Sequence, residues 1–235
     1  MDEIEPKPER GAVLAWPAAV VFDMDGTLLD TEPISLAAWR ETEAATGVRI
    51  PDGFYETMIG QSEAGYRARL ADVMPPGCDL DAFVREANAR YRRRLHEAPV
   101  PHKRGLLPLL DFLRDAGVPL AVATSTHRAM AEIKLRHAGL GERFAALVCG
   151  DEVPDSKPHP EIFARAVEAL GAAPARCLAV EDSPNGVLSA TGAGIPTVLV
   201  PDIAPVPAEI RARAAAVFPG LDALREALEV ARRGG

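Results

Sequence analysis

Short runs of apolar residues recur along the chain, and most of them stop at an acidic or a hydroxyl residue. The first run covers residues 18–23 and ends at Asp23. Similar runs cover residues 118–125, 145–152, 176–183 and 195–202, and a shorter one covers residues 215–220. Runs that are apolar throughout, rather than at every second position, are typical of parallel strands buried on both faces. The pattern therefore predicts a parallel sheet.

Helical spacing of apolar residues fills the stretches between these runs. Predicted helices cover residues 105–117, 126–140, 159–172 and 183–194, and a last one follows Gly220. Strands that alternate with helices of this length build βαβ units. Right-handed crossovers then place the carboxyl ends of all the strands along one edge of the sheet. We therefore predict an α/β fold with a Rossmann-like parallel sheet as its core.

One long segment interrupts this alternation. Residues 31–100 contain no strand-like run, but they show helical patterns around residues 33–47, 62–73 and 79–97. Asp30, just before the segment, is expected to be structural and to cap the next helix. Pro99 and Pro101 mark the end of the segment, because proline stops a helix. We predict two domains: a catalytic core made of residues 1–30 and 101–235, and an all-helical cap, residues 31–100, inserted after the first strand.

The composition of the chain argues against nucleic acid and membranes as binding partners. The chain has 235 residues and a formal net charge of −8, so its mean field repels nucleic acid and anionic membranes. No stretch has the ~18 consecutive apolar residues of a membrane span, and the acidic N-terminus does not suit a secretory leader. The three cysteines form no CxxC pair and indicate no disulfide framework. We expect a cytoplasmic monomer with neither nucleic-acid nor membrane partners.

Reactive side chains follow four of the predicted strands. In strand order they are Asp23 and Asp25, Thr124 and Ser125, Lys157, and Glu181 with Asp182. Each group alone is ordinary, because aspartate and serine often cap helices or turns and lysine is usually solvated. Their coincidence at successive strand ends predicts one shared site at the edge of the sheet where ligands bind.

The types of these residues indicate phosphoryl transfer. Several carboxylates in one place repel each other, and a hard divalent cation such as Mg²⁺, which prefers oxygen ligands, removes that cost. A carboxylate can also act as a nucleophile that forms a covalent intermediate. Lys157 can neutralise the nucleophile and a phosphate together, and the Thr124 hydroxyl with backbone N–H groups can hold phosphoryl oxygens. We therefore expect a Mg²⁺-dependent reaction through an aspartyl-phosphate.

Four segments resemble, in order, the four motifs of the haloacid dehalogenase-like hydrolases. They read DMDGTLLDTEP, VATST, SKPHPEIF and VEDSPNG, and the resemblance covers about residues 18–200. The chain resembles most closely the helical-cap phosphatases near β-phosphoglucomutase and the sugar-phosphate phosphatases. This resemblance implies an enzyme with Mg²⁺ as its cofactor and a small phosphorylated metabolite as its substrate.

Roles for individual residues follow from the same resemblance. It implies Asp23 as the nucleophile and Asp25 as the general acid and base. It implies a metal site made of Asp23, the main-chain carbonyl of Asp25, and Asp182, with Glu181 as a supporting or additional ligand. The phosphate-binding residues that it implies are Gly26, Thr124, Ser125 and Lys157.

Two alternative functions stay open. The β-phosphoglucomutases carry a histidine where this chain has Ser35 and an arginine where it has Glu63, so a phosphatase is favoured over a mutase. Dehalogenases lack the second aspartate, and the related phosphonoacetaldehyde hydrolases need a cap lysine that residues 31–100 do not contain. A phosphate-binding protein without catalysis is the other alternative. The complete set of expected catalytic residues favours an enzyme.

Overall fold

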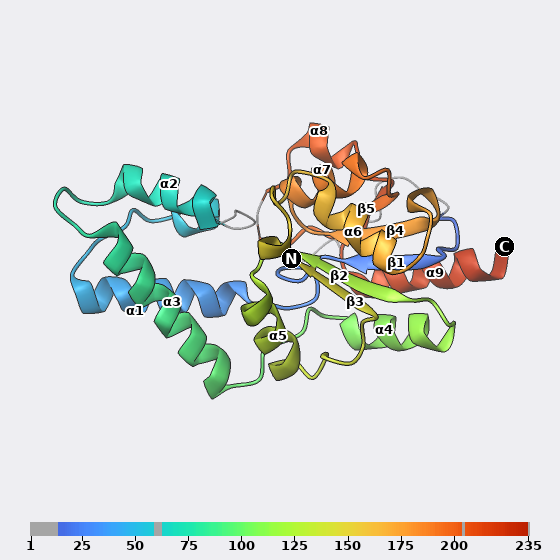
Figure 1. Ribbon diagram of the computed structural model, residues 1–235, viewed down its shortest axis with the longest axis horizontal. Coiled ribbons are helices and arrows are strands. Elements are labelled where there is room, and N and C mark those ends of the chain that lie inside the picture. Colours follow the sequence, from blue (N-terminus) through green and yellow to red (C-terminus); the bar gives the residue numbers. More distant parts are fainter. Residues whose placement is uncertain (1–13, 59–62, 204, 235) are drawn as a thin grey trace, which may run out of the picture.

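A parallel sheet of six strands forms the centre of the protein (Figure 1). The computed structural model describes residues 14–58, 63–203 and 205–234. Every neighbouring pair of strands is parallel, which confirms the predicted sheet. In sheet order the strands are β3 (Ala146–Cys149), β2 (Leu120–Thr124), β1 (Ala19–Phe22), β4 (Cys177–Glu181), β5 (Thr197–Leu199) and β6 (Ala216–Val217).

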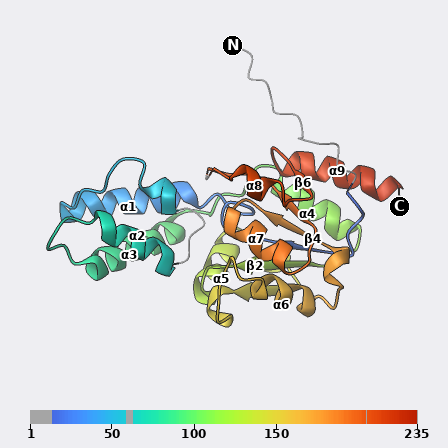
Figure 2. The same cartoon turned by 90° about the horizontal axis from the view of Figure 1, so that it is seen from above.

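Helices cover both faces of the sheet (Figure 2). In β1, Val20 and Phe22 belong to the apolar core on one face, where α4 (Leu106–Asp115), α5 (Arg128–His137) and α9 (Leu221–Gly234) pack. Ala19 and Val21 belong to the core on the other face, where α6 (Glu161–Ala169) and α7 (Pro184–Gly192) pack. Successive side chains of a strand point to opposite faces, so a strand that is covered on both sides must be apolar at every position. This requirement explains the continuous apolar runs in the sequence.

The long predicted helices lie where the spacing of apolar residues placed them. In α4, that spacing buries Leu106, Leu109, Leu110 and Leu113 against the sheet. After β2, three short segments do not follow from the pattern, because a single helical turn is too short to show a period. They are α8 (Ala208–Arg211) and the 3₁₀ turns η2 (Gly150–Glu152) and η3 (Pro174–Arg176). Within the described ranges, every helix is too short or too polar to cross a membrane.

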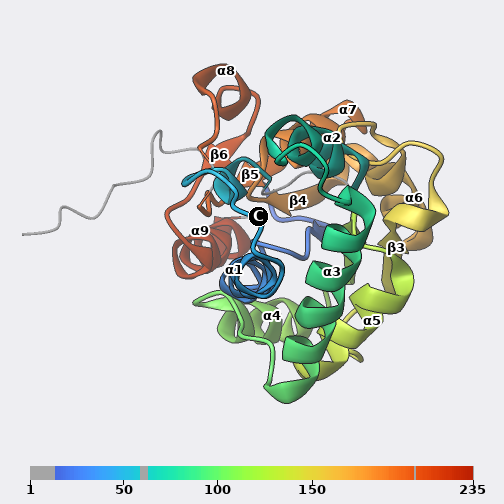
Figure 3. The same ribbon diagram turned by 90° about the vertical axis from the view of Figure 1, so that its left-hand side faces the viewer.

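Between β1 and β2 the chain forms a helical segment that lies at one end of the sheet (Figures 1 and 3). Its apolar cluster is separate from those of the sheet and includes Trp39, Ile50, Leu70 and Phe83. The helical content expected of this stretch is therefore observed, while the domain boundaries at residues 31 and 100 stay a prediction. The segment consists of α1 (Glu32–Thr46), the 3₁₀ turn η1 (Tyr55–Met58), α2 (Glu63–Val73) and α3 (Leu80–Glu97).

The two connections between the sheet and the helical segment run side by side. Leu29 and His102 form an antiparallel bridge, and the Asp30 N–H donates to the Pro101 carbonyl at 2.9 Å. The sequence predicted that Asp30 would cap α1. This prediction is wrong, because Thr31 occupies the N-cap position. The pairing holds the outgoing and the returning chain together at one point beside the sheet.

Candidate active site

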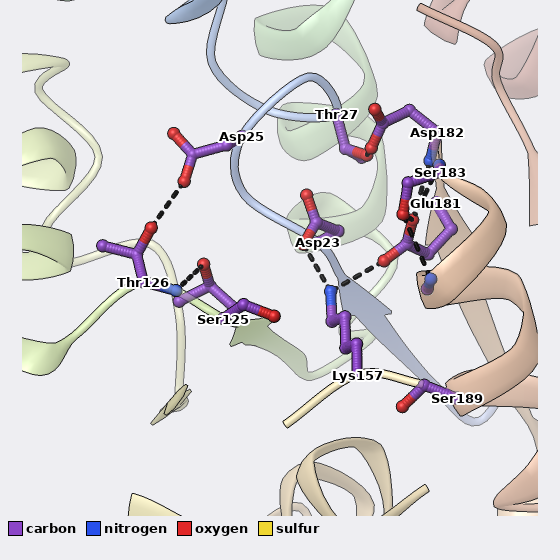
Figure 4. A network of polar contacts seen from close by, with 12 residues as sticks. Asp23, Asp25, Thr27, Ser125, Thr126, Lys157, Glu181, Asp182, Ser183 and Ser189 are labelled. Carbon is purple, nitrogen blue, oxygen red and sulfur yellow. Dashed lines mark hydrogen bonds and ion pairs between the residues drawn. The ribbon is translucent and has the colours of Figure 1, made fainter. Parts of the chain in front are cut away.

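Asp23 and Lys157 form the centre of the candidate site (Figure 4). Asp23 directly follows β1, and its N–H donates to the Val180 carbonyl of β4 at 3.0 Å. The Lys157 ammonium donates to Asp23 Oδ1 and, at 2.7 Å, to Glu181 Oε1. All three side chains are buried. The carboxylate that was expected to be the nucleophile is therefore held by a cation at the floor of the site.

Glu181 is bonded to protein donors through both of its carboxylate oxygens. Its Oε1 accepts from Lys157, and its Oε2 accepts from the Asp182 N–H, the Ser183 N–H and the Ser183 hydroxyl, each at 3.0 Å. Ser183 also caps α7, because its hydroxyl accepts from the Gly186 N–H at 3.1 Å. These bonds fix the turn between β4 and α7. Through them, Glu181 holds both Lys157 and the backbone of Asp182.

Asp182 lies against the loop that follows β1. The Thr27 hydroxyl donates to Asp182 Oδ1 at 3.0 Å. Gly26 has a φ of +89°, and a Cβ at this position would lie 2.4 Å from Asp182 Oδ2. Only glycine accommodates both the positive φ and this close approach. Gly26 is therefore needed to bring the Asp182 carboxylate beside the loop of Asp23 and Asp25.

Negative charge exceeds positive charge at the floor of the site. The Lys157 ammonium contacts the buried carboxyl groups of Asp23 and Glu181, and the buried carboxyl group of Asp182 adds a third negative charge close by. Burial raises the pKa of Asp23 to about 8, although Lys157 acts in the opposite direction. Burial and the neighbouring charges of Glu181 and Asp23 also raise the pKa of Asp182. A divalent cation beside Asp23 and Asp182 would stabilise their ionised forms, so the residues present fit a Mg²⁺ ion.

The expected metal site needs only two carboxylates. In the described part of the chain, no group of three or more His, Cys, Asp or Glu side chains is arranged to hold a metal ion. Mg²⁺ usually keeps several waters and takes one or two carboxylates plus a substrate phosphate. Asp23, Asp182 and the Asp25 carbonyl would be a set of this kind. Their role as ligands stays a prediction.

Asp25 is turned toward Thr126 and away from Asp23 (Figure 4). Its Oδ1 accepts from the Thr31 hydroxyl and from the Lys134 ammonium, both at 2.7 Å. Its Oδ2 accepts from the Thr126 hydroxyl at 2.8 Å. Burial acts to raise the pKa of Asp25, but the Lys134 charge and the hydrogen bonds outweigh it and lower the pKa below its usual range. Asp25 therefore has its own set of partners, separate from the group around Lys157.

Three of these partners were missed by sequence reasoning: Thr31, Thr126 and Lys134. A signal for Lys134 existed, because it lies between Ala131 and Leu135 on the apolar side of α5, where all three side chains are buried. A lysine on the buried side of a helix needs a charged partner. The hydroxyl groups of Thr31 and Thr126 gave no such signal, since threonine near a helix start usually serves as a cap.

Thr124 ends β2 and Ser125 follows it, at the same edge of the sheet. The Thr124 hydroxyl accepts from the Thr126 N–H at 3.1 Å, and the Ser125 hydroxyl accepts from the Ser156 hydroxyl at 2.8 Å. Both side chains line the cavity above Asp23. The structure thus brings these expected phosphate-binding residues to Asp23, while their role stays a prediction.

A cavity of about 690 Å³ lies between the edge of the sheet and the helical segment. Asp23, Asp25 and Asp182 line it from the sheet side. The helical segment contributes both apolar and polar walls, so the cavity can take a small ligand with a polar end. Its lining residues from that segment include Glu32, Ser35, Leu36, Trp39, Met58, Asn88, Tyr91 and Arg92.

Known proteins share both the motifs and the fold of this chain. Residues 17–194 match the haloacid dehalogenase-like hydrolase family, which confirms the resemblance seen in the four motifs. The chain is 32% identical over 183 residues to the fructose-1-phosphate phosphatase YqaB of Escherichia coli, covering 77% of this chain and 95% of that protein. It is also 32% identical over 177 residues to the phosphorylated carbohydrates phosphatase of Thermotoga maritima, covering 75% of this chain and 82% of that protein. The crystal structure of CbbY from Rhodobacter sphaeroides in complex with phosphate is similar, with a TM-score of 0.78 and 28% identity over 91% of this chain and 99% of that one.

Proposed function

This chain belongs to the haloacid dehalogenase-like hydrolase family, and from that premise we propose that it is a Mg²⁺-dependent phosphatase acting on a small phosphomonoester through an aspartyl-phosphate. The observation that carries the proposal is the buried Asp23 carboxylate, held by Lys157 at the floor of the cavity. A carboxylate that is buried beside a cation and still lines a cavity can meet a phosphorus atom while its charge is compensated.

The first step transfers the phosphoryl group to the protein. A carboxylate oxygen of Asp23 forms a bond to phosphorus, and the bond from phosphorus to the ester oxygen breaks. Asp25, in its acid form, donates a proton to that ester oxygen, so that an alcohol leaves. The negative charge of the bound phosphate favours the protonated form of Asp25. Lys157 keeps its contact with Asp23 and offsets the charge that gathers around the phosphorus.

The second step returns the protein to its starting state. Asp25, now ionised, accepts a proton from water, and the water oxygen forms a bond to phosphorus. The bond from phosphorus to Asp23 breaks, and inorganic phosphate is released. Thr124, Ser125 and backbone N–H groups at the start of α5 would hold the phosphoryl oxygens in both steps.

Mg²⁺ would be held by Asp23, the main-chain carbonyl of Asp25, and Asp182. Bound there, the ion would draw charge from the phosphoryl group and reduce its repulsion with Asp23. Glu181 was expected to support or join this set, and its bonds to Lys157 and to the turn of Asp182 favour the supporting role. Gly26 keeps the space beside Asp182 free of a side chain.

A sugar phosphate or a similar metabolite is the proposed substrate. Two relatives are described as phosphatases of fructose 1-phosphate and of phosphorylated carbohydrates. The alternative, a phosphosugar mutase, is less favoured, because Ser35 lines the cavity at the position of the mutase histidine. Glu63, at the position of the mutase arginine, begins α2, and its side chain lies outside the described residues. Action in the cytoplasm as a monomer belongs to the same proposal, as does the absence of nucleic-acid and membrane partners, which the net charge of −8 supports.

Phosphate release from a panel of phosphomonoesters, with and without Mg²⁺, tests the proposal. We expect turnover that requires both Mg²⁺ and Asp23, so Asp23→Asn should abolish it while the circular dichroism spectrum stays unchanged. β-Glucose 1-phosphate separates the alternatives, since a phosphatase gives free glucose and a mutase gives glucose 6-phosphate. Substantial turnover by Asp23→Asn would exclude the covalent mechanism. No turnover on any ester would favour a phosphate-binding protein without catalysis.

A further inference from the structure

Lys134 is a buried lysine to which the proposed reaction assigns no role. It lies on α5, and its side chain is only 6% exposed. Ala131 and Leu135 beside it belong to the apolar core under the sheet. Burying an ammonium group there costs free energy that only a charged partner can offset. Its partner is Asp25, whose Oδ1 lies 2.7 Å from the Lys134 nitrogen.

We propose that Lys134 is a positioning residue for Asp25, which fixes one carboxylate oxygen so that the other oxygen carries the proton of the reaction. This inference rests on the proposed function, because Asp25 is the general acid and base there. Lys134 itself does not touch the substrate in this proposal. It acts through the orientation of Asp25.

The two oxygens of Asp25 have different kinds of partner. Oδ1 accepts from Lys134 and from the Thr31 hydroxyl, and an ammonium group can only donate. Oδ2 contacts the Thr126 hydroxyl, which can accept as well as donate. A proton on Oδ1 would face the Lys134 ammonium at 2.7 Å, whereas Oδ2 contacts the Thr126 hydroxyl, whose oxygen lies 3.4 Å from the Lys134 nitrogen. The contacts therefore assign the transferable proton to Oδ2.

The orientation of Asp25 also suits its task. In an in-line transfer the leaving oxygen lies on the side of phosphorus opposite the nucleophile. An acid that serves this oxygen must therefore point away from Asp23 and toward the cavity. Asp25 is turned in this way in the structure and lines the cavity. Lys134 and Thr126 from the sheet domain, with Thr31 from the first connection, keep it there.

Tyr91 connects this arrangement to the helical segment. The Lys134 nitrogen lies 5.3 Å from the centre of the Tyr91 ring, a cation–π distance, and Tyr91 belongs to α3. Both residues line the cavity. Lys134 thus lies between Asp25 and α3, the helix that contributes Tyr91 to the wall of the cavity.

Two substrates with different leaving groups test the proposal on the full-length protein with Mg²⁺. An alkyl phosphate needs a proton on its leaving oxygen, whereas p-nitrophenyl phosphate leaves as a stable anion and needs little help from an acid. The parameter kcat/KM reports the steps up to departure of the leaving group. Loss of the positioning of Asp25 should therefore lower kcat/KM for the alkyl ester more than for p-nitrophenyl phosphate. We expect Lys134→Met to lower kcat/KM about 10- to 100-fold for the alkyl ester and about threefold or less for p-nitrophenyl phosphate.

Two further variants separate positioning from folding. Lys134→Arg keeps the charge at Oδ1 and should recover part of the alkyl activity. Leu135→Ala, on the same helix, removes a buried side chain without touching Asp25, so it should lower the melting temperature and leave the ratio of the two activities unchanged. If Lys134→Met does not fold, Lys134→Gln takes its place, because it keeps an N–H donor while it removes the charge.

A selective loss of alkyl activity in the Met or Gln variant supports the proposal. Equal losses on both substrates, no loss, or a gain in alkyl activity would each overturn it, since none is compatible with a lysine that presents Asp25 to the leaving oxygen. Wild-type protein that releases phosphate from neither ester would instead overturn the proposed function. The two failures are therefore distinguishable.

Discussion

Lys103 and Asp202 form an ion pair that joins the returning connection to the edge of the sheet, with the lysine nitrogen 2.5 Å from Asp202 Oδ1. The same nitrogen lies 3.4 Å from Asp30 Oδ1. Lys103 belongs to the returning connection, Asp30 to the outgoing one, and Asp202 follows β5. One side chain therefore fixes both connections to the edge of the sheet where the candidate site lies.

Loss of this ion pair should destabilise the protein. Lys103→Met leaves the Asp202 carboxylate, which is only 8% exposed, without its cation. We expect the free energy of unfolding, measured in urea, to fall by about 1–3 kcal/mol. Arg104→Met is the matched control, because Arg104 is 93% exposed and its pair with Asp222 is 3.4 Å long. The control should stay within about 0.5 kcal/mol of wild type; an equal effect of both variants would contradict the proposed role of Lys103.

Asp182→Asn should separate metal binding from folding. The substitution removes a buried carboxylate that Glu181 and Asp23 repel, so without Mg²⁺ the variant should melt no lower than wild type. Mg²⁺ should raise the melting temperature of wild type, and it should raise that of the variant much less. We expect the variant to bind Mg²⁺ about tenfold more weakly, or weaker still. Asp151→Asn, at an exposed position, is the control and should respond to Mg²⁺ like wild type. An unchanged Mg²⁺ response of Asp182→Asn would show that this carboxylate is not a ligand.

A methyl group at Gly186 should disturb the candidate site by displacing Glu181. An alanine Cβ would lie 1.7 Å from Glu181 Oε1, the oxygen that accepts from Lys157. Glu181 has no free direction in which to move, because its other oxygen holds the turn after β4. We expect Gly186→Ala to cost about 2–4 kcal/mol in stability and to lower kcat.

Gly192 offers the control for this substitution. It lies in the same helix, α7, and its Cβ would meet Pro160 Cβ at 3.4 Å and Pro160 Cγ at 3.8 Å, both ordinary contacts. Gly192→Ala should therefore be neutral or stabilising by up to about 1 kcal/mol. Thermal unfolding followed by circular dichroism measures both variants, and equal melting temperatures would contradict the contact with Glu181.

Trp39 should be the residue on which the core of the helical segment depends most. Its ring lies 5.8 Å from that of Tyr55, 5.9 Å from that of Tyr66 and 5.9 Å from that of Phe83. Trp39→Ala should cost about 3–5 kcal/mol, whereas Trp39→Phe keeps an aromatic ring and should cost less. Urea unfolding followed by circular dichroism checks the difference. Equal stability of the two variants would mean that Trp39 is not a packing centre.

Much of the fold could be predicted because its strands are buried on both faces. Burial on both faces leaves an uninterrupted apolar run that is visible in the sequence, and the parallel order then places the strand ends together. Asp23 and Asp182 could be assigned to one site on this basis, since each lies within two residues of a strand end. The short helix α8 could not be predicted, because one turn buries no periodic face.

The pairs that orient the site could not be predicted, because tertiary packing alone brings their members together. Lys134 lies 109 positions from Asp25, and Lys103 lies 99 positions from Asp202. No local spacing relates them, and each lysine alone resembles a solvated surface residue. For Lys134 the apolar neighbours on its helix gave a hint of burial, but they did not identify the carboxylate that it meets.

The strand order has a consequence for synthesis on the ribosome. β1 pairs only with β2 and β4 in the described sheet, and β4 comes late in the chain. A nascent chain therefore carries Asp23 long before Asp182 emerges, while the helices between β1 and β2 can form early from nearer contacts. Until β4 has docked beside β1, Asp23 lies apart from Asp182, the carboxylate with which it would share a cation in the proposed reaction. Capture of Mg²⁺ by the growing chain would thus mark the docking of β4 beside β1.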